Sequence, residues 1–562
     1  MKTKFWWVFL LAGVITINYV ASLIHYRIDL TAEKRYTLST PTKNLLHNIN
    51  DQVMIDVFLA GDLPADFRNL RNNTEELLQE FKEYSKSVTY RFHRPGEGLD
   101  EAQRQAVLQY LDSLGIRPTN VKVQIKAGEA QEERLVYPAA LVTYKEHVHP
   151  VDMLQGQDMT GGVQSLNTAT ALLEYKFAIA IQKVIRERPS VVGYLAGNGE
   201  PLSYNVYDLI EKTLKPNYGF GFVPIDSVPV IPAEFDAIMI VKPTMKFTDR
   251  QKVKLDQYVM HGGKIIWMID NLYAEMDSLM RTQSDFIAFD RGLNLNDMLF
   301  RYGVRINQDL VQDVQCDKLP LAVGNYGDKP QLQLVPWPYF PLLSSYNEHP
   351  ISKNLNNVLS VFPNSIDTVE AEGIKKTILL ASSDHSRTLS TPAIVSLNSV
   401  KTQDDLKTFD KKHLPIAVLL EGKFSSLYAN RLPVSTADSL SNVYKQPFLS
   451  TGVENKMIVI SDADIAGNVV TQNDGPLAMG TNQFTKMQYA NRDFIINCIE
   501  YLTNASGILA ARSKTFVLRL LDPGKTEEEK TKWQIINTAL PVVLILIFAF
   551  IYQAIRNRQY AT

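Results

Sequence analysis

Two long apolar runs near the ends of the chain dominate its hydrophobic pattern. Residues 5–24 carry no charge and are long enough for a helix to cross a bilayer. A second run, residues 535–552, contains Pro541, which membrane helices tolerate. A signal peptide is the alternative for the first run, but Tyr19 stands where a cleavage site needs a small residue. The pattern therefore predicts transmembrane helices at 5–24 and 534–555.

Residues 25–160 alternate between strand and helix patterns. They predict strand, helix, strand and helix, followed by a meander of strands; the first four elements are expected at 53–60, 67–86, 88–94 and 100–114. This order is typical of a thioredoxin-like fold. A redox enzyme of that fold needs a Cys-x-x-Cys pair, and residues 25–160 contain no cysteine. We therefore expect a thioredoxin-like scaffold without redox chemistry.

The pattern of residues 161–187 predicts one long connecting helix. In residues 188–521, continuous apolar strands alternate with amphipathic helices, which is typical of a parallel sheet covered on both faces. Residues 290–450 hold strand-like runs separated by many turns and predict an insertion or subdomain. The polar residues 522–533 predict a linker before the second span.

Composition narrows the classes of function. The chain has 58 basic and 60 acidic residues, a balance that argues against nucleic acid as a partner. Its two cysteines, Cys316 and Cys498, are too few for a disulfide framework or a cysteine-based zinc site, although the sequence leaves open whether they pair. The chain has no Walker lysine motif, so it is not itself an ATPase.

Two spans place both ends of the chain on one side of the membrane. Basic residues flank both sides of each span, so the positive-inside rule gives no clear orientation. We expect the short tails, residues 1–4 and 556–562, to be cytoplasmic and the long central part to lie on the opposite side.

The sequence "GYLAGNGEP" follows a predicted strand and is as rich in glycine as many ligand-binding loops. Its glycines match neither the dinucleotide-binding pattern nor the phosphate loop, which requires Gly-Lys-Ser/Thr. We expect a tight turn after the strand, with positive φ at Asn198 or a glycine. The residues left as candidate contacts for a partner or ligand are Gly197, Asn198, Gly199 and Glu200.

Acidic residues follow two other predicted strands. Asp270 ends one of them, and Asp462 and Asp464 follow the other. Ligand sites of α/β sheets lie at such carboxyl ends, and paired carboxylates can bind a divalent cation; helix capping and loop hydrogen bonding are the alternative, which we favour. Neither Ser nor Cys stands beside Asp270, so acyl transfer has no candidate nucleophile. The sequence thus predicts no catalytic residue, cofactor or metal, and leaves these acids as candidate contacts.

Several segments occur in an order shared with a known family: "RIDLTAEKRYTLSTPTKNLL" after the first span, "VVGYLAGNGEP", "QKVKLDQYVMHGGKIIWMID", and "NRDFIINCIEYLT" before the last span. Together they resemble the GldG family of gliding-motility-associated ABC transporter auxiliary proteins. The resemblance implies a bacterial inner-membrane protein with most of its chain in the periplasm. It also implies partnership with an ABC-2-type permease and, through it, a cytoplasmic ATPase. The central domain would be similar to class I glutamine amidotransferases without their catalytic cysteine.

These observations predict an α/β chain in which two transmembrane helices flank a thioredoxin-like domain and a non-catalytic amidotransferase-like domain. The predicted function is that of a non-enzymatic auxiliary subunit of an ABC-2-type transporter complex involved in gliding motility, with a periplasmic scaffold next to the permease. Two alternatives stay open: a periplasmic substrate receptor of an ABC transporter, and a membrane-anchored hydrolase-like enzyme.

Overall fold

A computed structural model describes residues 11–16, 37–116, 118–123, 132–154, 163–282, 285–326, 329–397, 403–504, 506–513 and 523–560. The chain divides into two compact units, Met1–Thr515 and Phe516–Thr562. Of the predicted first span, the described residues include only 11–16, which are helical. The rest of that prediction lies outside the described residues.

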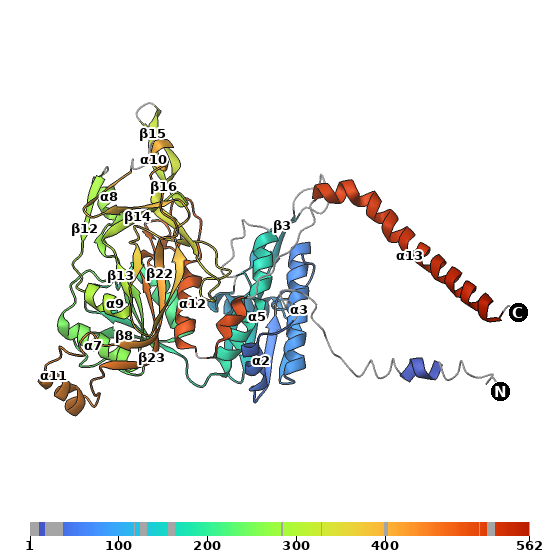
Figure 1. Cartoon of the computed structure of the whole chain (residues 1–562), viewed down its shortest axis with the longest axis horizontal. Helices are drawn as coiled ribbons and strands as arrows, with labels where there is room; N and C mark the ends of the chain where they lie inside the picture. Colours follow the sequence, from blue (N-terminus) through green and yellow to red (C-terminus); the bar gives the residue numbers. More distant parts are fainter. Residues whose placement is uncertain are drawn as a thin grey trace. The chain divides into compact units, whose positions relative to one another are not determined.

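The second unit contains one long helix, α13 (Pro523–Tyr560) (Figure 1). Its segment Glu529–Arg558 is apolar and long enough to cross a bilayer, and it is the one such helix in the described part of the chain. The second predicted span lies within this segment. Residues 523–533, predicted as part of a linker, form the first turns of the helix, because Glu and Lys are good helix formers.

The N-terminal part of the first unit is built on a four-stranded sheet in the order β2-β1-β5-β6. Its strands are β1 (Val53–Val57), β2 (Val88–Phe92), β5 (Ala139–Tyr144) and β6 (His147–Asp152). β1 and β2 are parallel, whereas β5 is antiparallel to both β1 and β6. The connecting elements are α3 (Ala65–Tyr84), α4 (Glu101–Ser113) and the separate ladder of β3 (Thr119–Val123) and β4 (Glu132–Val136). The predicted first four elements are present, and the thioredoxin-like classification stays a prediction.

Helix α5 (Val163–Ile185) links the N-terminal sheet to the rest of the unit and packs beside α3 (Figure 1). Its Phe177 belongs to the core of the N-terminal sheet, whereas the next residue, Ala178, belongs to the core of the large sheet described below. Near its end, Lys183 Nζ lies 3.3 Å from the buried Glu500 Oε1. The predicted connecting helix therefore takes part in two cores.

The large sheet has ten strands, in the order β15-β16-β19-β22-β23-β10-β9-β7-β8, with β17 paired to β16. Its parallel half consists of β7 (Val191–Ala196), β8 (Gly219–Pro224), β9 (Ala237–Val241), β10 (Lys264–Met268) and β23 (Thr451–Ile460). Successive residues of β9 face different cores: Ile238 packs on the side of α7 (Asp249–Met260), and Met239 on the side of α12 (Asn491–Thr503). Both faces are buried, as continuous apolar strands predict.

The other half of the sheet is antiparallel, so the predicted parallel sheet is in fact mixed. β22 (Pro415–Ser425) is antiparallel to β23 and to β19 (Ile374–Ala381). β19 pairs in turn with β16 (Lys329–Ser345), which pairs with β15 (Cys316–Tyr326) and β17 (Val358–Leu359). The helices described between β19 and β23 are short: α10 (Gln403–Leu406), and α11 (Val434–Asp438) with η4 (Ser439–Val443) directly after it. Strands from the predicted insertion, residues 290–450, therefore continue the main sheet.

Smaller elements complete the first unit. They are the sheet β11 (Leu272–Tyr273), β12 (Asp285–Asp290) and β21 (Ala393–Ser396); the ladders β13 (Val304–Ile306) with β18 (Ile366–Thr368), β14 (Asp309–Asp313) with β20 (Ser386–Ser390), and β24 (Val470–Thr471) with β25 (Gly475–Pro476); and the helices α2 (Thr40–His47), α6 (Lys215–Asn217), α8 (Met276–Thr282), α9 (Asn296–Tyr302), η2 (Tyr204–Val206), η3 (Asp208–Leu214), η4 (Ser439–Val443), η5 (Asp464–Ala466) and η6 (Ile508–Ser513). Cys316 and Cys498 are both free thiols, which answers the question of their pairing.

Candidate functional site

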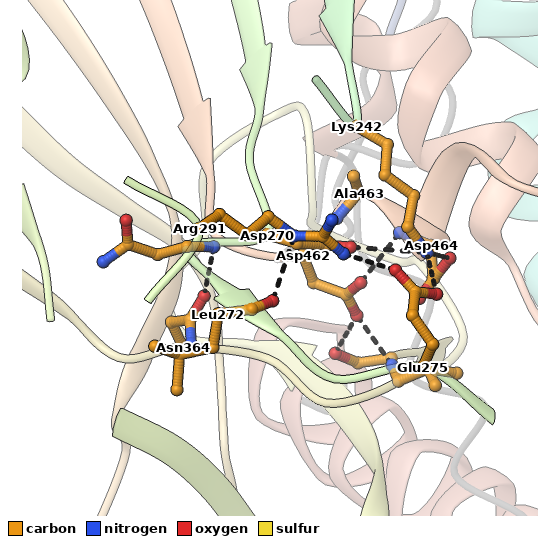
Figure 2. Close-up of polar contacts among 12 residues, drawn as sticks. Lys242, Asp270, Leu272, Glu275, Arg291, Asn364, Asp462, Ala463 and Asp464 are labelled. Carbon is orange, nitrogen blue, oxygen red and sulfur yellow. Dashed lines mark hydrogen bonds and ion pairs between the residues drawn. The ribbon is translucent and has the colours of Figure 1, made fainter. Parts of the chain in front are cut away.

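Ionisable side chains converge where three neighbouring parallel strands end. Lys242 follows β9, Asp270 follows β10, and Asp462 and Asp464 follow β23. Because β10 lies between the other two strands and is parallel to both, these ends share one edge of the sheet. Figure 2 shows the side chain of Lys242 directed from the end of β9 toward Asp464. The structure thus brings the three predicted acids to one sheet edge, where two of them, Asp270 and Asp464, contact a lysine that was not among the predicted site residues.

Lys242 is the centre of this cluster. Its Nζ lies 2.6 Å from Asp464 Oδ1, 3.0 Å from Glu275 Oε2 and 3.4 Å from Asp270 Oδ2, and its side chain is 18% exposed. Burial lowers the pKa of Lys242, but the negative charges of Asp464, Asp270 and Glu275 outweigh burial and raise this pKa well above its ordinary value. Lys242 therefore stays protonated and neutralises the carboxylates around it.

Asp462 is fully buried and holds the loop after β23. Its Oδ2 accepts a hydrogen bond from Val361 N at 2.7 Å and a short one from the Ser360 hydroxyl, and its Oδ1 accepts from Asp464 N at 2.8 Å. Burial raises the pKa of Asp462 well above its ordinary value, and the charges of Asp464 and Asp270 act in the same direction. Its contacts are those of a residue that shapes the loop.

Arg291 and Asp270 complete the cluster (Figure 2). Arg291, only 4% exposed, forms a short ion pair with Glu275, which therefore lies between two cations, Arg291 and Lys242. Asp270 Oδ1 accepts a hydrogen bond from Ala463 N at 2.7 Å. Asp270 Oδ2 is buried and accepts no hydrogen bond from the described residues. The negative charge on this oxygen is therefore stabilised by the nearby ammonium of Lys242.

The glycine turn after β7 is held by its own carboxylate. Glu200 Oε2 accepts hydrogen bonds from Gly197 N at 3.1 Å and Asn198 N at 2.8 Å. Gly197 and Gly199 have φ of 139° and 80°, which residues with side chains rarely adopt. Burial raises the pKa of Glu200 despite these hydrogen bonds. The predicted tight turn is thus present, with positive φ at the two glycines.

The same turn is attached to the loop that carries Lys242. Asn198 O accepts hydrogen bonds from Thr244 N at 2.9 Å and Met245 N at 2.8 Å, and Asn198 Nδ2 donates to Gln251 Oε1 at 3.2 Å. Asn198 is 1% exposed, so these contacts are internal to the protein. All the candidate residues named from the sequence therefore lie at the carboxyl ends of the parallel strands, but Asn198 is not available to a partner.

An open cleft of about 420 Å³ lies beside the cluster. It is lined by residues of the loop after β9 and of the segments around β11, α8 and β12, among them Thr244, Tyr273, Glu275, Phe289 and Arg291. Glu275 and Arg291 belong both to the cleft and to the buried cluster. Through these two residues the cluster borders the cleft.

The arrangement is suited to holding loops together and poorly suited to catalysis. A lysine nucleophile must be free of its proton, whereas Lys242 is surrounded by carboxylates that keep it protonated. A divalent cation would neutralise paired carboxylates, but the ammonium of Lys242 already does so. Within the described ranges, no group of three or more His, Cys, Asp or Glu side chains could hold a metal ion.

Sequence reasoning missed Lys242, Glu275 and Arg291. A signal for Lys242 was present, because it directly follows the apolar strand "AIMIV" and so had to lie at the same sheet edge as Asp270. No comparable signal marks Glu275 and Arg291, which reach the cluster from the irregular chain around β11 and β12.

Residues 189–498, more than half of the chain, match the profile of a family described as an ABC-type uncharacterized transport system, an ABC transporter auxiliary domain. The chain belongs to this family. Residues 32–143, in the N-terminal part, match a domain of unknown function. Membership of an ABC transporter auxiliary family associates the chain with an ABC transporter complex.

One relative and two solved structures illustrate how distant these similarities are. A Borreliella burgdorferi protein, described as uncharacterized, is 21% identical over 427 residues, which cover 73% of this chain and 75% of the relative. Among solved structures, the chain is similar to the mmIFT52 N-terminal domain (13% identity, 56% of this chain and 98% of that chain, TM-score 0.30). It is also similar to the exo-beta-1,4-mannosidase Op5Man5 from Opitutaceae bacterium strain TAV5 (10% identity, 82% and 51%, TM-score 0.21). TM-scores this low support no argument about shared fold or function.

Proposed function

We propose that this protein is a non-enzymatic, membrane-anchored auxiliary subunit of an ABC-2-type transporter, with most of its chain in the periplasm next to the permease. Family membership over residues 189–498 supports the transporter association, and the apolar part of α13 supports an anchor. One or two spans cannot form a translocation path, so the permease and a cytoplasmic ATPase must be separate chains. Helix packing through van der Waals contacts would hold the anchor against the permease.

The observation that carries the non-enzymatic part of the proposal is the neutralised cluster around Lys242. It occupies the sheet edge where α/β enzymes usually carry their reactive groups. Here the charged groups are paired with one another and with backbone N–H groups, at distances such as 2.6 Å for Lys242 and Asp464. A site of this kind fixes the shape of a surface, which is what a docking subunit needs.

The non-enzymatic proposal is tested by separating assembly from chemistry. We would replace Asp464 and Glu200 by Asn and Gln, which keep the shape of each side chain but remove its charge. We expect a variant to lose transport only if it also misfolds or no longer co-purifies with the permease. A variant that folds and assembles as the unmodified protein does, yet abolishes transport, would point to the hydrolase-like alternative.

The resemblance to the GldG family extends the proposal to gliding motility. If the transporter serves that machinery, deleting the gene should stop cell spreading on a surface, and the unmodified gene should restore it. If the deletion strain spreads normally although wild-type cells contain the transporter complex, the proposed role in motility is wrong and the proposed role in the transporter still stands.

A substrate receptor is the second candidate, because clefts open at the edge where ligands of α/β sheets bind. Besides the cleft near Lys242, one of about 510 Å³ is lined by polar residues at the ends of β16 and β19, including Ser345, Ser382 and His413. Native mass spectrometry of the protein purified from its own cells tests this role. A bound small molecule that is released on unfolding would favour the receptor over the scaffold.

A further inference from the structure

The small sheet formed by β11, β12 and β21 has apolar side chains on both faces. One face belongs to a buried core with Leu272, Phe286 and Val395. A sheet with one buried face normally presents polar residues on the other. This sheet does not, so its outer face requires an explanation.

The outer face carries four large apolar side chains. They form two cross-strand pairs, Ile287 with Ile394 and Tyr273 with Phe289. Their exposed fractions are 58% and 63% for the isoleucines, and 37% and 53% for the aromatic residues. The Tyr273 and Phe289 rings stack, with centroids 5.2 Å apart. Contiguous exposed apolar residues of this kind mark interaction sites, and we refer to these four as the outer face.

Carboxylates surround the outer face. Asp285 and Asp290 stand at the two ends of β12, Asp277 is on α8, and all three are exposed. Asp277 and Asp290 also line the cleft into which Tyr273 and Phe289 project. The nearest cations of the cluster, Lys242 and Arg291, are largely buried and are paired with their own carboxylates. The charge presented to a partner by these residues is therefore negative.

Neither edge of this sheet suits strand addition: the edge strand β11 is only two residues long, and the backbone of the other edge strand, β21, is occupied. Strand addition requires free backbone groups on an edge strand. On β21, Ile394 O accepts a hydrogen bond from the Tyr339 hydroxyl at 3.3 Å, and Ser396 O accepts one from Trp337 Nε1 at 3.2 Å. A partner must therefore lie across the outer face and contact side chains.

We propose that the outer face docks an extramembrane segment of the permease that carries apolar residues flanked by Lys or Arg. This inference rests on the proposed function. Apolar residues of the segment would cover Ile287, Ile394 and Phe289, and its basic residues would meet the surrounding aspartates. An anionic lipid surface fits poorly because these carboxylates would be repelled. A second copy of this chain fits poorly as well, since it would oppose aspartate to aspartate.

Site-specific photocrosslinking of the full chain in its own membranes tests this proposal. A photoreactive benzoylphenylalanine would replace Phe289, and the matched control would carry it at Phe300 of α9, which is equally exposed at 53%. We expect a crosslink to the permease from position 289 and none from position 300. The crosslinked peptide should contain Lys or Arg beside apolar residues.

Two sets of variants examine the contributions of apolar contact and charge. The double variant Ile287→Thr with Ile394→Thr keeps β-branched residues on the strands and should lower the crosslink yield about tenfold. The matched control, Leu332→Thr with Leu334→Thr at exposed positions of β16, should leave the yield unchanged. Asp277→Asn with Asp285→Asn should lower the yield about fivefold at low salt, and Asp51→Asn with Asp474→Asn should leave it unchanged.

The outcomes separate this inference from the proposed function. Co-purification of the permease without a crosslink from position 289 overturns the docking site and leaves the auxiliary role standing. A crosslink from 289 to lipid or to a second copy of this chain also overturns it. Failure to recover any permease with the unmodified chain overturns both.

Discussion

Lys242 Nζ lies 2.6 Å from Asp464 Oδ1, although the two residues are 222 positions apart in the sequence. The contact exists because β9 and β23 both flank β10 and run parallel to it, so their carboxyl ends meet at one edge. Asp270 and Glu275 complete the surroundings of the lysine. The charge of Lys242 thus connects loops that follow three strands.

Replacing Lys242 by Met should destabilise the protein by about 3 kcal/mol, because the buried Asp270 and the partly buried Asp464 would lose the cation that compensates their charge. The double variant Lys242→Met with Asp464→Asn should be less destabilised than the sum of the single variants by about 1–2 kcal/mol. Chemical denaturation of the full chain in detergent measures both effects. Lys246→Met, at an exposed position in the same loop, is the control. Additive effects of the two single changes would contradict the coupling.

Stability should depend on pH through Asp464. Burial raises the pKa of Asp464 to about 6, against an ordinary value of 3.8, although the charge of Lys242 acts in the opposite direction. The folded protein therefore binds this proton more tightly than the unfolded chain. The resulting stabilisation is complete below pH 3.8 and is lost as the pH rises through about 6.

The matched measurement compares unfolding free energies at several pH values between 4 and 7. From pH 7 to pH 4, the unmodified protein should gain about 2 kcal/mol relative to an Asp464→Asn variant. Asp474→Asn, which removes an exposed carboxylate elsewhere, should follow the unmodified protein. If the unfolding free energies of the unmodified protein and of Asp464→Asn change with pH in the same way, the pKa of Asp464 is the same in the folded and the unfolded chain.

The glycine turn should tolerate no side chain at position 199. A Cβ there would overlap with Thr244 Oγ1, and φ is 80°. Gly98 has the same φ but open space around it, so Gly98→Ala shares the backbone strain without the overlap. We expect Gly98→Ala to cost about 1 kcal/mol and Gly199→Ala about 2–3 kcal/mol. If Gly98→Ala and Gly199→Ala lower thermal stability equally, the contact between the glycine turn and the loop that carries Thr244 contributes nothing to stability.

Membrane orientation can be tested by labelling with a membrane-impermeant maleimide. The native thiols should react little: Cys498 is buried, and burial, followed by the charges of Asp313 and Asp317, raises the pKa of Cys316 to about 12. Glu146→Cys, in the exposed turn before β6, should react when only the outer membrane is permeabilised. Arg558→Cys, near the end of α13, should react only after the inner membrane is opened as well. The reverse pattern would place the bulk of the chain in the cytoplasm.

The strands β9, β10 and β23 were predictable because each contains a continuous apolar run, "AIMIV", "IIWM" and "MIVI" respectively. The runs that form β19 and β22 were also visible as strands in the sequence. Their antiparallel pairing with β23 was not, because strand pairing between segments far apart in the chain depends on tertiary contacts rather than on local pattern.

The candidate site was predictable in position but not in chemistry. The rule that parallel strands present their carboxyl ends at one edge led to Asp270, Asp462 and Asp464. It could not show that Glu275 and Arg291 would reach the site from irregular chain. Nor could it show that Asn198 would be buried, with its backbone O and its Nδ2 hydrogen-bonded to residues 244, 245 and 251. Only a residue's surroundings decide whether a carboxylate is open to a ligand or paired internally.

The most direct test of the central proposal is affinity purification of the tagged full chain from its own membranes in mild detergent, followed by quantitative mass spectrometry. An untagged strain and a tagged, unrelated membrane protein with one span provide the controls. An auxiliary subunit should bring with it an ABC-2-type permease and a separate ATPase subunit, both enriched over the controls in a constant ratio to the tagged chain. Recovery of the folded chain with neither subunit would contradict the proposal.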